Sequence, residues 1–128
     1  MNINKLKNNK FYFGKLKNLE EHQGWIVGSF YDKDDPRKCD FMEIVYREHK
    51  AGDTSPPHYH EKKVELLIIL KGKAEYQIND KKIKLASGDY FFADVNNVIS
   101  GKFLESSKII AIHSPSIPGD KKLWDGKF

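Results

Sequence analysis

Two histidines and a glutamate stand at spacings that suit the coordination of a metal ion. His58 and His60 are two positions apart, so on a β-strand both side chains point to the same face, roughly 6.6 Å apart along the chain. Two imidazoles at that separation can both reach one ion at about 2.1 Å. Glu65 opens an apolar run over 66–70, and a buried carboxylate is costly unless a partner such as a cation satisfies it. Two histidines and one carboxylate with open positions suit iron(II), zinc, manganese or nickel.

The elements that would position these residues are predicted to be strands. Turn-forming residues recur along the chain, among them Gly52, the pair Pro56-Pro57 and Gly101. Between the turns lie short stretches rich in β-branched and aromatic residues, which predict strands over 25–31, 41–46, 64–70, 74–78, 83–85, 90–92 and 109–112. This spacing is typical of an all-β sandwich or barrel, and the one helical element expected is a short turn within 16–23.

The clearest local unit is a β-hairpin over 74–85. Apolar and polar residues alternate on both sides of Asn79 and Asp80, which form a two-residue turn. The alternation predicts that one face of the hairpin, carrying Tyr76, points into the core.

The segment 52–72 resembles the first motif of the cupin family. That motif has a glycine, five residues, His-x-His, four residues, a glutamate, six residues and a glycine. The residues in register are Gly52, His58, His60, Glu65 and Gly72. The resemblance covers about 41–112 and implies a small antiparallel, jelly-roll-like β-barrel, often paired into dimers. It also implies that the two histidines and the glutamate hold a divalent metal ion as a cofactor.

The second motif of the family is matched only in part. Gly88 stands at its start, but Asp94 and Asn96 replace the expected proline and glycine, and Ile99 occupies the position of the histidine that serves as fourth ligand. Three side chains and water could then hold the ion, another residue could replace the missing histidine, or the metal could be lost. His113, which ends the last apolar stretch, is the candidate for a fourth ligand or a substrate contact.

Two tyrosines are candidate pocket residues. Tyr46 and Tyr76 can donate hydrogen bonds to a ligand, although filling the core is the commoner role of a buried tyrosine. Tyr59 lies between the two histidines in the sequence, so its side chain is expected on the opposite face of the strand. The sequence assigns no catalytic residue.

Length and composition fit one globular domain. The chain has 128 residues, of which 39% are hydrophobic and 31% charged, and this is enough for a core of its own. We expect an N-terminal extension over 1–22, a barrel core over 41–112 and a C-terminal tail over 113–128 that closes one barrel end.

The apolar runs are too short to cross a bilayer, the first residues lack a secretory signal, and Cys39 is the only cysteine. The expected location is therefore cytoplasmic.

The net charge of +4 raises the possibility of a nucleic-acid partner. The excess lysines gather towards the two ends of the chain, and no arginine-rich helix or zinc-finger spacing occurs. We therefore expect a small-molecule ligand and neither nucleic acid nor a membrane as partner. A basic rim could attract an anionic ligand. We also expect a homodimer, because the aromatic stretch 11–13 makes an exchange of strands between subunits plausible.

Three functions fit these residues. The first is a metal-dependent enzyme acting on a small acid or sugar, either an isomerase, epimerase or decarboxylase or, with iron, a dioxygenase. The second is a non-catalytic module that binds a sugar or another small ligand. The third is a metal-free epimerase of nucleotide-linked keto sugars, with His60 as base and Tyr76 as acid. The cupin fold hosts many activities, so it does not select among these.

Overall fold

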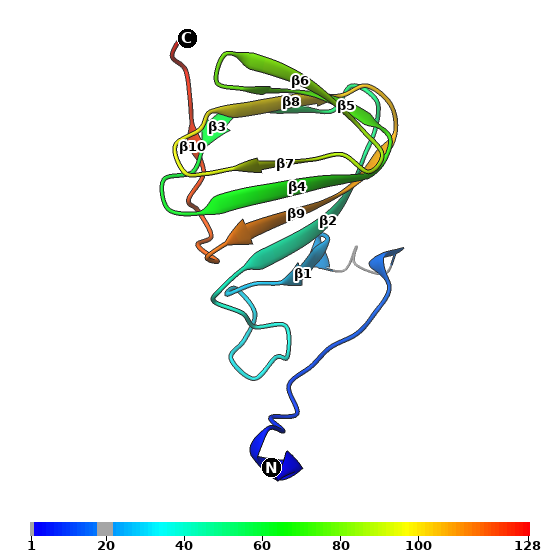
Figure 1. Cartoon of the computed structure of the whole chain (residues 1–128), viewed down its shortest axis with the longest axis vertical. Helices are drawn as coiled ribbons and strands as arrows, with labels where there is room; N and C mark the ends of the chain where they lie inside the picture. The colour runs from blue at the N-terminus through cyan, green and yellow to red at the C-terminus, as the bar shows by residue number, and fades with distance from the viewer. Residues whose placement is uncertain (1, 18–21) are drawn as a thin grey trace.

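The computed structural model of the chain describes residues 2–17 and 22–128 and consists of two stacked antiparallel sheets (Figure 1). The strands are β1 (Trp25–Val27), β2 (Glu43–His49), β3 (Thr54–Tyr59), β4 (Val64–Lys71), β5 (Lys73–Ile78), β6 (Lys81–Ala86), β7 (Tyr90–Ala93), β8 (Ile99–Phe103), β9 (Ser107–Ser114) and β10 (Lys122–Leu123). The first sheet has the order β1-β2-β9-β4-β7, and the second sheet has the order β10-β3-β8-β5-β6. The prediction of an all-β antiparallel barrel is confirmed.

The core lies between the two sheets and follows the two-residue period of the strands. On β4 the buried positions are Glu65, Leu67 and Ile69, and the residues between them are less buried. Apolar side chains of both sheets meet in the middle, where Ile69 is fully buried. The acid at the start of this inward series on β4 is therefore held beside the core by the strand itself.

The predicted hairpin forms as expected. Strand β5 pairs with β6, Tyr76 lies opposite Ile83, and Ile78 lies opposite Lys81. Asn79 has a φ of 56°, a left-handed conformation that asparagine tolerates and that such tight turns require. Tyr76 is 4% exposed, so its face of the hairpin is the inward one.

The prediction of a turn at Pro56-Pro57 is wrong, because both prolines lie inside β3. The pairing of β3 with β8 shifts register between Ser55 and His58. Proline has no N–H to give to a neighbouring strand, so within a sheet it is tolerated at such an irregularity. The two prolines thus mark a bulge directly before the first histidine rather than the end of a strand.

Gly101 was also expected to form a turn and instead lies in the middle of β8. A Cβ atom at this position would come within 2.5 Å of the Tyr76 ring, so the glycine makes room for a core aromatic side chain. The strand predicted over 25–31 is shorter than expected and ends at Val27. β8 and the short β10 were not predicted at all.

The sheets extend beyond the range 41–112, because β1 precedes that range and β10 follows it. A 3-10 helix spans Ile3–Lys5. Positions 16–17 of the helical turn predicted within 16–23 have helical conformation, and 18–21 lie outside the described residues. No helix in the described part of the chain is long and apolar enough to cross a membrane.

Candidate metal centre

The fold brings His58, His60 and Glu65 together at one end of the barrel. His58 is near the end of β3, His60 follows that strand, and Glu65 is on β4 of the opposite sheet. One ligand atom from each side chain lies within 4.8 Å of the other two. All three residues are buried, with at most 7% exposed. The end of β3 and the short connection that follows it therefore bring the two histidines to the glutamate of the opposite sheet.

Backbone carbonyl groups orient both histidines. The Nδ1 of His58 donates a hydrogen bond to the oxygen of Pro56 at 2.8 Å, and the Nδ1 of His60 donates to the oxygen of Asp120 at 2.6 Å. A carbonyl oxygen can only accept, so each Nδ1 carries a proton and each neutral ring keeps its lone pair on Nε2. Burial lowers the pKa of His58, which favours this neutral form. Histidines that bind metals are typically oriented in this way.

Two buried atoms at the centre of the cluster lack hydrogen-bond partners among the described residues. They are Nε2 of His60 and Oε1 of Glu65, which lie 3.4 Å apart. A nitrogen lone pair that faces a carboxylate oxygen in a buried site is unfavourable unless something positive lies between them. Two ligands at about 2.1 Å from one ion are separated by about 3.0 Å at a right angle and about 3.4 Å at the tetrahedral angle. The residues present therefore fit a divalent metal ion.

The carboxyl group of Glu65 is held in its charged form. Burial acts to raise its pKa, but the neighbouring His113 more than compensates, so the pKa of Glu65 lies below its usual range. An ionised carboxylate and two neutral imidazoles are the protonation states that metal coordination needs.

His113 lies beside the cluster and between two acids. In the first sheet it is directly opposite Glu43 of β2 on one side and Glu65 of β4 on the other. Its Nδ1 is 3.2 Å from Oε1 of Glu43, and its Nε2 is 3.6 Å from Oε2 of Glu65. Burial alone would lower the pKa of His113, but its contacts with the two acids raise it. The structure thus places His113 next to Glu65, outside the set of three mutually close ligand atoms.

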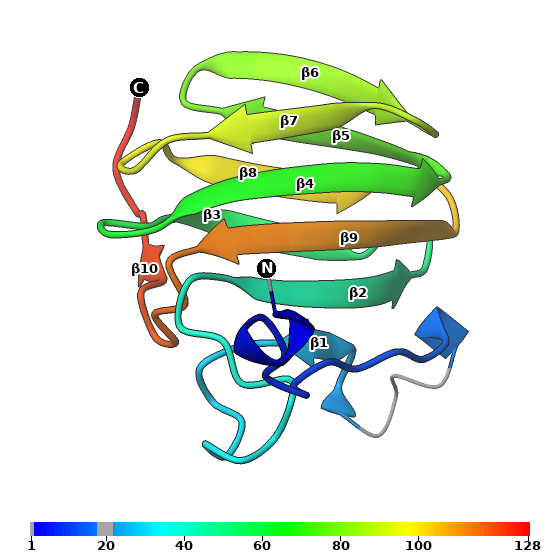
Figure 2. The same ribbon diagram turned by 60° about the horizontal axis from the view of Figure 1, so that its bottom comes forward.

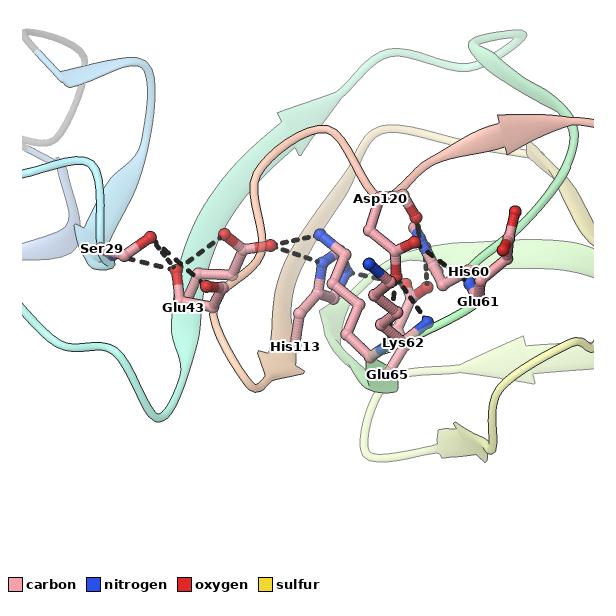
Figure 3. Close-up of polar contacts among 10 residues, drawn as sticks. Ser29, Glu43, His60, Glu61, Lys62, Glu65, His113 and Asp120 are labelled. Atoms are coloured by element: carbon pink, nitrogen blue, oxygen red, sulfur yellow. Dashed lines mark hydrogen bonds and ion pairs between the residues drawn. The ribbon is translucent and has the colours of Figure 1, made fainter.

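Behind His113 lies a buried polar network that the sequence reasoning missed (Figure 3). Glu43 is 2% exposed, Lys63 forms an ion pair with it, and Oγ of Ser116 donates to its Oε2 at 3.1 Å. Burial acts to raise the pKa of Glu43, but His113 and Lys63 hold it at about 2. One signal was available in the sequence. Glu43 is two positions before the apolar Val45 in a predicted strand, so it had to share the inward face.

Asp120 in the C-terminal tail was missed as well. Its carboxylate accepts hydrogen bonds from the backbone N–H groups of Glu61, Lys62 and Lys63, at 3.3, 2.8 and 3.1 Å. Burial acts to raise the pKa of Asp120, but these donors lower it below its usual value. Figure 3 shows Asp120 above the connection that follows His60. Nothing in the local sequence indicates this role, because the contacts span almost half of the chain.

The structure separates the two candidate tyrosines. Tyr76 lies in the core against Phe91, with the ring centroids 5.1 Å apart, and its pKa is raised by burial and by the charge of Glu65. Tyr46 is on the opposite side of β2 from Glu43, and its hydroxyl donates to Glu48 at 3.1 Å. It lines a separate cavity of about 310 Å³ on the outside of the first sheet. The fold therefore does not bring Tyr46 to the cluster.

Ile99 is the direct neighbour of His58 in the pairing of β8 with β3. Only 2% of it is exposed. Directly opposed residues of an antiparallel pair project to the same face, with Cβ atoms about 5 Å apart. The position at which a fourth ligand was expected is thus beside the first histidine and is filled by an apolar side chain.

Comparison with known proteins relates part of the chain to one family. A family model described as "Cupin domain" matches residues 45–98, which include both histidines and Glu65. Residues 45–98 therefore match a cupin domain, and the two stacked antiparallel sheets have the cupin double-stranded β-helix fold. No curated protein matches the sequence.

Several solved structures share the fold. KdgF from Halomonas sp. is 25% identical with a TM-score of 0.59, and the match covers 61% of this chain and 73% of that one. An uncharacterized protein with a double-stranded β-helix domain from Klebsiella pneumoniae is 19% identical with a TM-score of 0.61, covering 68% and 77%. Oxalate decarboxylase from Bacillus subtilis is 17% identical with a TM-score of 0.60, covering 66% of this chain and 24% of that one. The last two are likenesses of fold alone.

Proposed function

We propose that this protein binds a divalent metal ion through His58, His60 and Glu65 and acts on a small acid or a sugar-like compound. The observation that carries the proposal is the pair of buried atoms without hydrogen-bond partners among the described residues, Nε2 of His60 and Oε1 of Glu65. Their separation of 3.4 Å suits two ligands of one ion. The hydrogen bonds at both Nδ1 atoms support the same conclusion, because they leave the Nε2 lone pairs available.

The donor set favours a catalytic or ligand-binding site over a purely structural one. Three protein ligands leave coordination positions open, whereas structural sites are usually closed by four side chains. Ile99 offers no donor at the neighbouring position. A divalent ion in such a site supplies a Lewis acid that can polarise a carbonyl or carboxylate oxygen of a bound compound.

The residues beside the cluster favour an anionic or polyhydroxylated ligand. His113 carries a raised pKa, and the buried Lys63 lies behind it on Glu43. A protonated His113, held between Glu43 and Glu65, places positive charge beside the cluster, which favours a carboxylate or hydroxyl group of a ligand there. Oxalate decarboxylase, which has the same fold, acts by its name on a small acid; the class of compound is extended to this chain as part of the proposal.

The test is the metal content of the protein, purified without chelator and without an affinity tag that binds metal. We expect near-stoichiometric divalent metal in the wild type and less than about a tenth of it after His58→Ala. The matched control is His49→Ala, because His49 stacks on Phe103 away from the cluster and its loss should leave the metal content unchanged. Absence of metal in all three proteins, even after reconstitution with each candidate ion, contradicts the proposal.

A metal-free reaction is the second candidate, favoured by one feature of His60. Because its Nδ1 is engaged by Asp120, its Nε2 is set to accept a proton from a bound keto sugar, with Tyr76 as a possible acid. A thermal-shift screen against nucleotide-linked sugars tests this function. Stabilisation that persists in the presence of a chelator would support it over the metal-dependent one. A non-catalytic sugar-binding module would show the same shift without turnover.

A further inference from the structure

A cavity of about 420 Å³ lies at the end of the barrel opposite to the candidate metal centre. Figure 2 shows this end, where β2 and β4 finish and β9 begins, away from the connection between β3 and β4. Glu65 and Lys71 are six positions apart on β4, so the two sites are separated by about 20 Å. The polar residues that line the cavity include Glu48, His49, Lys50, Lys71, Ser106 and Lys108. We call it the basic cavity.

The pairing of the strands brings two lysines of the basic cavity face to face. Lys71 of β4 lies directly opposite Lys108 of β9, and like charges in this arrangement destabilise an antiparallel pair. On its other side Lys108 lies opposite Glu48 of β2. Their ion pair is 3.8 Å long, and its two side chains are 49% and 57% exposed, so it gains little. The repulsion between the two lysines is therefore only weakly offset.

The remaining polar groups add to this positive charge. Lys50 follows β2 directly and is exposed. Neither Lys50 nor Lys71 forms an ion pair within the part of the chain that the structure describes. The nearby Asp53 accepts hydrogen bonds from Nδ1 of His49 at 3.3 Å and from the backbone N–H of Lys50 at 3.0 Å. Among the described residues that line the cavity, three ammonium groups thus face one carboxylate.

These groups favour a small ligand that carries a phosphate. Ammonium groups bind phosphate oxygens through charge-assisted hydrogen bonds, and Ser106 adds an exposed hydroxyl group. The volume lies within the range of about 300–1,000 Å³ that is usual for small-molecule sites. A single-stranded nucleic acid would also need aromatic rings on which its bases stack. The ring of His49 already stacks on Phe103, with the ring centroids 4.1 Å apart.

We propose that the basic cavity binds a small phosphate ester, with the phosphate between the ammonium groups of Lys71 and Lys108 and Lys50 as a third contact. A dianion at this position neutralises the two opposed lysines, so binding removes a repulsion that the sheet otherwise carries. This site shares no residue with the candidate metal centre, and the inference does not depend on the metal.

The test is a titration of the full-length, ¹⁵N-labelled protein with glycerol 3-phosphate at low salt, followed by the NMR shifts of the backbone amides. We expect a dissociation constant on the order of 1 mM and the largest shifts at 48–50, 71–73 and 106–108. Lys71→Gln should raise the dissociation constant at least about tenfold, because a charged contact to the phosphate is lost. Two variants should keep the wild-type constant. Lys84→Gln changes an exposed strand lysine opposite Glu75, and His58→Ala changes the metal centre.

Thermal unfolding gives a second measurement on the same variant. Without ligand, Lys71→Gln should unfold at the temperature of the wild type or above it, because the variant no longer opposes two like charges. Glycerol 3-phosphate should raise the unfolding temperature of the wild type, since it binds the folded state alone, and should leave that of Lys71→Gln nearly unchanged. Lys71 is exposed, so its substitution should not disturb the fold, and circular dichroism checks this.

Several results would overturn the proposal. One is the absence of amide shifts at about 20 mM ligand, well above the expected constant. A second is an unchanged constant in Lys71→Gln. Shifts that disappear in His58→Ala would place the phosphate at the metal centre instead. Equal shifts with glycerol would show that the phosphate is not recognised. Tighter binding of a short single-stranded oligonucleotide, weakened by Lys71→Gln, would replace the small ester by nucleic acid.

Discussion

The Nδ1 of His60 donates a hydrogen bond of 2.6 Å to the backbone carbonyl oxygen of Asp120, which is 60 positions away in the sequence. The carboxylate of the same Asp120 accepts the N–H groups of the three residues that follow the histidine. Strand β10 comes directly after this contact and pairs with β3, placing Leu123 opposite His58. The orientation of His60 is therefore set by a tail that lies outside the matched range 45–98.

Replacement of Asp120 by alanine should weaken both the fold and the metal site. Three backbone N–H groups lose a charged acceptor, and we expect a loss of about 2–3 kcal/mol in the free energy of unfolding. Metal affinity should fall about tenfold, because the backbone carbonyl of residue 120, which orients His60, is no longer held in place by the side-chain contacts of Asp120. Urea unfolding and titration against a competing chelator measure the two effects. The control is Asp125→Ala, at an exposed position. An Asp120→Ala protein with wild-type metal affinity would contradict the role of the tail.

Removal of the positive charge of Lys63 from its buried ion pair with Glu43 should strongly destabilise the protein. Lys63→Met leaves Glu43 with one cationic partner fewer in a site where it is 2% exposed. We expect a cost of about 3–5 kcal/mol in urea unfolding. The double variant Glu43→Leu/Lys63→Met removes both charges, so it should recover much of that loss. If the double variant were less stable than Lys63→Met alone, the unpaired carboxylate would not be the cause.

Lowering the pH should destabilise the protein, because the buried carboxylate of Glu43 becomes protonated. The pKa of this group is about 2 in the fold against an ordinary value of 4.5, so the folded state binds the proton less readily than the unfolded chain. The resulting stabilisation, on the order of 3 kcal/mol, is fully present above about pH 4.5 and is lost as the pH falls towards 2. Urea unfolding at a series of pH values measures this slope.

The variant Glu43→Gln should flatten the acid part of that profile. Its control is Glu61→Gln, a substitution at an exposed acid, which should keep the wild-type slope. An unchanged slope in Glu43→Gln would assign the acid sensitivity to other groups, of which Asp120, with its own lowered pKa, is the first to examine.

Local patterns in the sequence were sufficient for the fold class and for the three central residues. The spacing of His58 and His60 and the acid at the start of an apolar strand are properties of neighbouring positions, so strand geometry alone could bring them together. Most strands could likewise be predicted from neighbouring positions, because they are short stretches of β-branched and aromatic residues between turn-forming residues. The bulge at Pro56-Pro57 escaped prediction because proline is read as a turn, although a strand irregularity also accommodates it.

The features that the sequence did not predict depend on contacts between segments that are distant in the chain. The pairing of Glu43 with Lys63 and the capping of the β3–β4 connection by Asp120 are set by the closure of the barrel, which no local period encodes. Tyr46 was expected near the site, but it lies on the other side of its strand from Glu43. A shift of one residue in the strand register decides which face of the sheet a side chain occupies. The homodimer and the cytoplasmic location stay predictions.

The position of Ile99 allows the missing-ligand hypothesis to be tested directly. Ile99 lies opposite His58 and faces the same way, so Ile99→His would place a third imidazole beside the two others. We expect metal affinity to rise severalfold, by about 1 kcal/mol or more, because a fourth side chain replaces water. Isothermal titration of the metal-free protein with zinc measures the change.

The control for this substitution is Ile99→Asn, which introduces a polar group of similar size but no imidazole. Both variants lose a buried apolar side chain and should be less stable without metal, by about 2–4 kcal/mol. Only Ile99→His should regain stability when zinc is added, since binding to the folded state alone shifts the unfolding equilibrium. Equal zinc affinity in Ile99→His and the wild type would mean that another group, with His113 the nearest candidate, already fills that coordination position.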